Sequence, residues 1–227
     1  MLSETKNGSQ VKVGNTKTRG NYFAEANCFH TNVRRGVTHN RSGTRIIALS
    51  EDFLRGLRAA VIDECGPAAD TVFRTCGRRY GELFAKRFEK EMTEFYGQKP
   101  HDFIFALFNA CLVELFNHHG WGLLRMDFSR HDRGVVIITL DNAIMADLIR
   151  QAERPTDTLF AGIFAGFFSY LSGQELDCVQ TACKAKGDPT SRFVVGLAPR
   201  LKTALEGVAQ GLSHDALLPQ ILDSRVE

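Results

Sequence analysis

Sequence features that would take the protein across or into a membrane are absent. The first twenty residues contain no apolar stretch of the kind that forms a secretory signal, and nowhere do about 18 uncharged apolar residues run together. The six cysteines form no C-x-x-C pair, and several lie within apolar runs, as reduced thiols do. These absences predict a cytoplasmic protein with no membrane span.

A strong net charge and the common catalytic motifs are also missing. Lys and Arg number 28 against 26 Asp and Glu, and the net charge of +2 is too small to attract nucleic acid or an anionic membrane. The sequence contains no G-x-G-x-x-G, P-loop, G-x-S-x-G or H-E-x-x-H motif. We therefore expect neither a nucleic-acid partner nor enzymatic activity.

The chain divides into a short tail and one large domain. Residues 1–20 contain no aromatic residue and are rich in Gly, Asn, Thr and Lys, so they bury too little surface to offset the entropy of ordering. Over the whole chain, 44% of residues are hydrophobic and 24% are charged, which is typical of a packed globular protein. We predict a flexible tail over residues 1–20 and a single domain over residues 21–227.

Hydrophobic periodicity and turn residues predict hairpins that alternate with helices. The expected strand pairs are 31–37 with 44–49, 123–128 with 134–140, and 175–185 with 192–197. The expected helices are 51–64, 68–96, 101–118, 142–153 and 158–171, followed by two more near 201–212 and 217–222. This order predicts an α+β fold in which an antiparallel sheet built of hairpins packs against a layer of helices.

The second half of the chain carries a family resemblance. The run AGIFAGFFSYLSG at 161–173 and the run CVQTACKAKGDPTSRF at 178–193 resemble the 4-vinyl-reductase, or hydrocarbon-binding, domain family, and the order of parts is similar over about residues 21–212. The resemblance implies a fold shared with transport-particle subunits and with phenol-sensing domains of bacterial regulators. It also implies dimerisation through helices and an apolar ligand enclosed between helices and sheet, without hydride transfer.

Aromatic residues are the main indication of a binding site. The chain has seventeen Phe and one Trp, and the expected helices 101–118 and 158–171 carry Phe on several sides. Such helices line either a cavity or a dimer interface. For a cavity, the expected ligand-binding residues are Phe105, Phe108, Phe116, His118, Trp121, Phe164 and Phe168. In the phenol sensors a Trp and a His bind the ligand hydroxyl, so the resemblance gives that role to Trp121 and to His118 or His119. The alternative is that both histidines merely end a helix.

Metal and haem ligands are incomplete. Several sensors of the resembling family hold zinc through a Glu-x-x-Cys-x(7)-Cys pattern, whose positions here are Gln180, Cys183 and Ser191. Two anionic ligands are thus replaced, and we predict no zinc, although Cys178 and Glu175 lie nearby in the sequence and could substitute. A histidine could bind haem axially, and the candidates are His30, His101, His118, His119 and His131. The haem-propionate motif Tyr-x-Ser-x-Arg is absent, so no cofactor is predicted.

Three functional hypotheses follow. The first is a stand-alone sensor or carrier domain for an apolar or aromatic small molecule that acts as a homodimer and signals to a separate protein partner. The second is an interaction or scaffold module without a small ligand. The third is a tetrapyrrole-handling protein of (bacterio)chlorophyll or haem metabolism. The dimer is expected to use the helix 68–96, whose aromatic stripe comprises Phe73, Tyr80, Phe84, Phe88 and Phe95.

Overall fold

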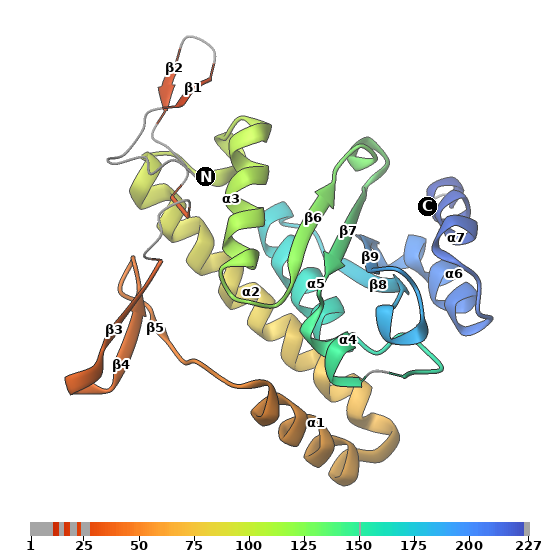
Figure 1. Cartoon of the computed structure of the whole chain (residues 1–227). Coiled ribbons are helices and arrows are strands. Elements are labelled where there is room, and N and C mark those ends of the chain that lie inside the picture. Colours follow the sequence, from red (N-terminus) through yellow and green to blue (C-terminus); the bar gives the residue numbers. More distant parts are fainter. Residues whose placement is uncertain (1–10, 14–15, 19–21, 24–27, 150, 225–227) are drawn as a thin grey trace, which may run out of the picture. The chain divides into compact units, whose positions relative to one another are not determined.

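The computed structural model describes residues 11–13, 16–18, 22–23, 28–149 and 151–224, and it has the predicted α+β fold (Figure 1). The chain forms two compact units. Unit 1 comprises residues 1–48 and 88–119, and unit 2 comprises residues 49–87 and 120–227. In the described part of the chain, no helix is long and apolar enough to cross a membrane.

The strands of unit 1 form two small antiparallel sheets. In the predicted tail, which lies largely outside the described residues, β1 (Val11–Val13) pairs with β2 (Thr16–Thr18). The other sheet comprises β3 (Phe29–Asn32), β4 (Val37–Asn40) and β5 (Arg45–Ile46).

The predicted strand 31–37 is wrong, because the 3-10 turn Val33–Arg35 interrupts it. The side chain of Asn32 accepts a hydrogen bond from the Arg35 amide, and Gly36 closes the turn with a φ of 63°. A side chain that bonds to nearby backbone in this way competes with strand pairing. The turn joins β3 to β4, so the two predicted strands become three.

The helices of unit 1 are α3 (Phe105–Asn117) and the last third of α2 (Ala69–Tyr96). The helix predicted at 101–118 begins later than expected, because the 3-10 turn Pro100–Asp102 comes first and Ile104 is extended. Apolar side chains of both helices form a buried core, which also contains Tyr22 and Phe23 and includes Phe88, Met92, Cys111, Leu112, Leu115 and Phe116.

Unit 2 is built on a four-stranded antiparallel sheet with the order β6-β7-β9-β8 (Figure 1). Its strands are β6 (Leu123–Asp127), β7 (Val135–Asp141), β8 (Leu176–Ala182) and β9 (Ser191–Leu197). The hairpins predicted around 128–134 and 185–192 are confirmed. Gly134 and Gly187 take positive φ values of 67° and 102° in these turns, where a residue with a Cβ would be strained.

Helices cover both faces of this sheet, where a single layer was predicted. On one face lies α5 (Thr158–Ser172), whose Phe164 ring meets that of Phe193. On the other face lie α6 (Ala198–Ala209) and α7 (His214–Asp223). Successive strand residues point to opposite faces, so the neighbouring Val194 belongs to the core under α6 and α7.

Three further helices complete unit 2: α1 (Glu51–Cys65), the first two thirds of α2, and α4 (Ile144–Ile149). The helix predicted at 142–153 is shorter than expected. Asn142 has a φ of 52°, which no right-handed helix accepts, so α4 cannot begin at that residue.

Glycines set the distance between α2 and α5. A Cβ on Gly77 or Gly81 would overlap a backbone carbonyl of α5, and one on Gly162 or Gly166 would overlap a backbone carbonyl of α2. Each helix thus presents two glycines four residues apart to the backbone of the other. Small residues at this spacing allow helix backbones to approach closely.

Candidate functional site

A cluster of aromatic rings surrounds Trp121 in unit 2. Trp121 follows Gly120, whose positive φ of 69° turns the chain between α3 and β6. The centre of the half-buried indole lies 5.8 Å from the ring of Tyr80, 5.5 Å from that of Phe84 and 5.7 Å from that of Phe160. Rings from α2 and α5 therefore meet the only tryptophan of the chain.

The other two predicted site residues of unit 2 extend this cluster. Phe164 is fully buried and contacts Phe160 at 6.2 Å and Phe193 at 5.2 Å between ring centres. Phe168 is also buried and contacts Phe167, which in turn contacts Phe84. Trp121, Phe164 and Phe168 are thus joined through intervening rings, and the rings pack against one another as a core.

The predicted site residues of unit 1 have different environments. Phe116 is buried, Phe108 is half-buried with its ring centre 6.5 Å from that of Phe88, and Phe105 is 58% exposed. His118 places Nε2 2.5 Å from the carbonyl oxygen of Phe23. Because a carbonyl oxygen only accepts, Nε2 must carry the proton, and this contact holds His118 to the main chain.

Sequence reasoning missed the segment that His118 contacts. Tyr22 and Phe23 are buried, and the Tyr22 amide donates a 2.9 Å hydrogen bond to the hydroxyl of Tyr96. Burial, together with the charge of Glu91, raises the pKa of Tyr22 to about 12. Two adjacent aromatic residues have no periodicity, so no helix or strand pattern marks them.

The remaining histidines named as haem candidates lie apart from any common site in the sequence. His30, His101 and His131 are exposed. His119 contacts the carbonyl oxygen of Leu115 through Nδ1 at 2.7 Å. Nothing in these positions indicates a haem ligand, and the absence of haem stays a prediction.

The positions of the family zinc pattern lie in a buried polar cluster. The side chain of Gln180 donates to Ser191 Oγ at 3.4 Å and to Asp157 Oδ2 at 3.3 Å, and Cys183 Sγ lies 3.7 Å from Thr156 Oγ1. Gln180 and Ser191 are thus hydrogen-bonded to each other, a role that neither of the anionic zinc ligands they replace could share.

The two substitute zinc ligands do not join this cluster in a metal-binding arrangement. The side chain of Glu175 is 90% exposed and pairs with Arg78, whereas Cys178 is fully buried, and burial raises the pKa of its thiol. Among the residues that the structure describes, no three His, Cys, Asp or Glu side chains are grouped as metal ligands. The absence of zinc remains a prediction.

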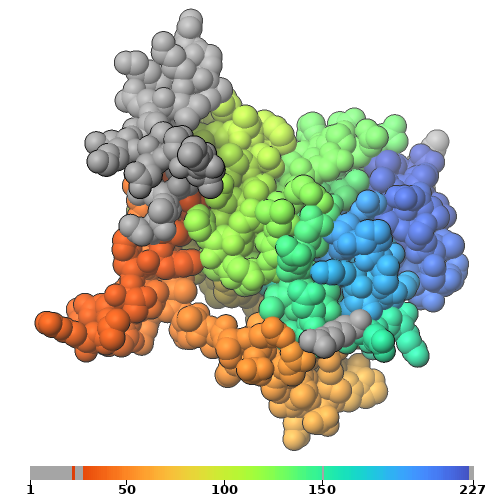
Figure 2. All heavy atoms as spheres, in the orientation of Figure 1, coloured from red at the N-terminus to blue at the C-terminus, as the bar shows by residue number. Residues whose placement is uncertain are grey.

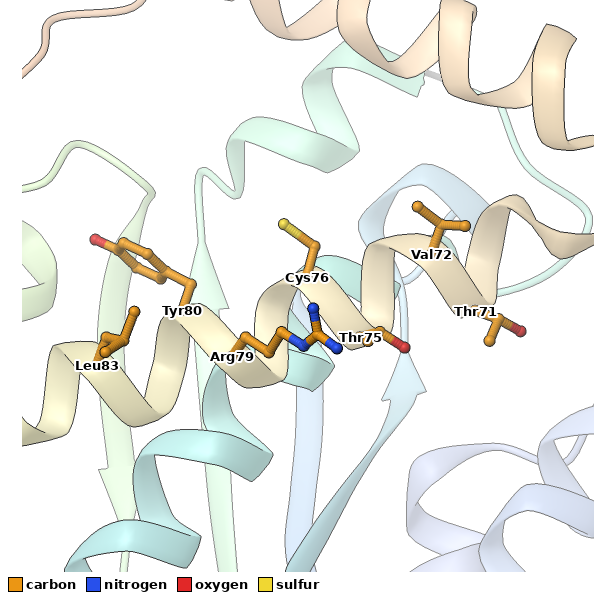
Figure 3. Close-up of a pocket in the computed structure, with 7 residues that line it drawn as sticks. All are labelled: Thr71, Val72, Thr75, Cys76, Arg79, Tyr80 and Leu83. Carbon is orange, nitrogen blue, oxygen red and sulfur yellow. The ribbon is translucent and has the colours of Figure 1, made fainter.

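An apolar surface on α1 and α2 is the second candidate site. α1, orange in Figure 2, has no buried residue, and its Phe53 and Leu57 are 52% and 47% exposed. On α2 an open groove of about 550 Å³ is lined by Thr71, Val72, Thr75, Cys76, Arg79, Tyr80 and Leu83. Figure 3 shows that these side chains project from successive turns of the one helix. Tyr80 belongs both to this groove and to the cluster around Trp121.

Comparison with known proteins confirms the resemblance. Residues 136–197, from β7 to the end of β9, match the model of the 4-vinyl-reductase domain. No curated protein matches the chain.

Among solved structures, the phenol-responsive sensory domain of the transcription activator PoxR, crystallised with phenol, has the same fold. It superposes with a TM-score of 0.62 at 17% identity, covering 88% of this chain and 94% of that one. A vinyl-4-reductase family protein from Methanocaldococcus jannaschii matches at a TM-score of 0.47 and 18% identity over 66% of this chain and 82% of that one. Subunit 3 of a trafficking protein particle complex from Naegleria fowleri, covalently bound to palmitic acid, matches at a TM-score of 0.47 and 14% identity over 65% and 94%.

Proposed function

We propose that this protein is a small-molecule-binding domain of the sensor or carrier type, that its ligand is apolar or aromatic, and that it acts as a homodimer in the cytoplasm without catalysing a reaction. The observation that carries the proposal is the fold shared over 88% of the chain with a sensory domain crystallised with phenol. The match of residues 136–197 to the 4-vinyl-reductase domain supports it independently.

The chemistry of the Trp121 cluster supports an aromatic ligand. Rings of Tyr80, Phe84 and Phe160 surround an indole that is only half-buried. An aromatic ligand would bind through edge-to-face ring contacts of the same kind, and the indole N–H and the Tyr80 hydroxyl would supply polar groups for its orientation. Since the rings fill their own space, a ligand must displace part of this packing to enter.

The apolar surface of α1 and α2 supports the homodimer. Exposed apolar residues on two successive helices of a globular protein mark a contact surface. Opposite the groove, α2 is already fixed to α5 by glycines, so a partner can approach only from the open side. We assign that side to a second copy of the chain, because its own exposed α1 supplies the apolar helix face that the groove needs.

Fluorescence of Trp121 tests the ligand directly, because no other tryptophan contributes. Titration with phenol and then with alkylphenols of increasing length should change the emission in a saturable way. The melting temperature should rise with ligand concentration by mass action. Phe160→Leu, which keeps the core apolar but removes a ring from the cluster, should weaken binding about tenfold or more, as expected for a lost ring contact with its burial.

Leu205→Ala is the matched control, since Leu205 is an exposed apolar residue of α6 on the far face of the sheet. It should bind as the wild type does. If folded wild-type protein shows no saturable emission change with any compound of the series, the ligand hypothesis is wrong. The open face of α1 and α2 would then favour the second candidate function, an interaction module without a small ligand.

A further inference from the structure

The carboxyl group of Asp157 is buried directly before α5. Asp157 is 0% exposed, and it precedes the first residue of that helix. Its side chain makes no capping hydrogen bond to the helix. Within the described residues, Oδ1 is buried and has no hydrogen-bond partner. A charged carboxylate in this position lacks the solvation that water would give it.

Asp157 also connects α5 to the sheet. Its amide donates to Oε1 of Gln180 at 2.9 Å, and the Gln180 amide group donates back to Oδ2 at 3.3 Å. Gln180 in turn reaches Ser191 on β9, and Ser191 Oγ accepts from the Lys184 amide at 3.3 Å. One carboxyl group thus lies at the joint between α5, β8 and β9.

We propose that Asp157 is a proton-responsive joint: the neutral carboxyl holds the start of α5 against β8 and β9, and ionisation weakens that attachment. A neutral carboxyl tolerates burial with one unpartnered oxygen, whereas the ionised group concentrates charge there. Relief comes from opening the first turn of α5 so that water reaches Oδ1. Asp157 is not one of the family zinc positions, and the inference does not depend on any ligand.

The surrounding charges do not cancel this effect. Burial raises the pKa of Asp157 to about 7 from 3.8, although hydrogen bonds from Gln180 and Ser191 and the charge of Arg58 on α1 lower it. On the turn after β8, the Lys184 ammonium group pairs with Asp147 on α4, and Asp188 accepts from the Cys183 amide. Cys183 itself is buried near Thr156.

The sign of the pH dependence follows from the raised pKa. The folded protein holds this proton more tightly than the unfolded chain, so the contribution to stability is complete below about pH 4 and is lost as the pH rises through about 7. Over that window the equilibrium constant for unfolding should increase about tenfold per pH unit because of Asp157 alone.

Urea unfolding of wild type and Asp157→Asn between pH 5 and 8 isolates this contribution. The ratio of the wild-type unfolding constant to that of the variant should rise about tenfold per pH unit up to about pH 7 and then level off. Asp147→Asn is the control, since the Asp147 side chain is 51% exposed, and its ratio should stay flat. A flat ratio for Asp157→Asn as well would overturn the proposal.

A measurement on the wild type keeps the test valid if the variant folds poorly. The carboxyl carbon of Asp157, followed by NMR, should titrate with a midpoint near 7. Hydrogen exchange at the Asp157 and Ala161 amides, corrected for intrinsic rate, should accelerate above that pH, because these amides bond to Gln180 Oε1 and to the Asp157 carbonyl. A midpoint near 4 with constant protection would contradict the joint.

Discussion

At the scale of single residues, burial separates the aromatic side chains that hold the core from those that lie at the surface. Phe164 is fully buried between the rings of Phe160 and Phe193, whereas Phe105 is mostly exposed. Both were expected to line one pocket, since sequence shows that a residue is aromatic but not which side of its helix is covered. Trp121 differs from both because it is half-buried within the cluster.

Replacing Phe164 with Ala should therefore lower the free energy of unfolding by about 3–5 kcal/mol, because the change removes buried surface and leaves a void. Chemical denaturation measures the loss. Phe105→Ala is the matched control and should cost less than about 1 kcal/mol at its exposed position. A loss for Phe164→Ala as small as that of the control would show that the ring lines open space rather than a packed core.

At the scale of elements, the sequence predicts structure where a repeat is long and fails where one contact decides. The helix expected at 68–96 is observed at Ala69–Tyr96, since apolar residues recur over about eight turns of it. The strand expected at 31–37 is interrupted because a single side-chain bond from Asn32 favours a turn. Tyr22, Phe23 and Asp157 carry no pattern at all, so their burial becomes visible only in the folded structure.

The glycine contact between α2 and α5 is another feature that the sequence alone does not reveal, because each glycine needs its partner helix to explain it. Gly81→Ala should destabilise the protein by about 1–3 kcal/mol or more, since the added Cβ meets the carbonyl oxygen of Ile163 and overpacking outweighs the gain in helix propensity. Thermal and urea unfolding measure the change.

Gly56→Ala is the matched control for this substitution. Gly56 lies inside α1 with nothing within 4 Å of a Cβ, so Ala should stabilise the helix by up to about 1 kcal/mol. If the two glycine substitutions shift stability in the same direction, close packing of α2 on α5 does not set the distance between these helices.

At the scale of the whole molecule, the exposed apolar residues of α1 and α2 predict self-association. Light scattering should give a dimer at micromolar concentration. Leu83→Glu places a charge on the α2 surface, where Leu83 is 64% exposed, and should weaken the dimer about 30-fold or more, as loss of a contact worth at least about 2 kcal/mol does.

Leu205→Glu, on the exposed surface of α6, is the control and should leave the dimer intact. A wild-type protein that is monomeric at micromolar concentration would exclude the dimer, whatever the variants do. The same outcome would leave the apolar surface of α1 and α2 available to a different protein partner.

Native mass spectrometry of the protein purified from its own host tests the central proposal most directly, because it detects a small molecule and a second copy together. We predict a species of twice 25.3 kDa that carries additional small organic mass, which is lost when the protein is denatured. A bare chain mass that persists after incubation with phenol and the alkylphenol series would contradict the account of this protein as a small-molecule-binding domain.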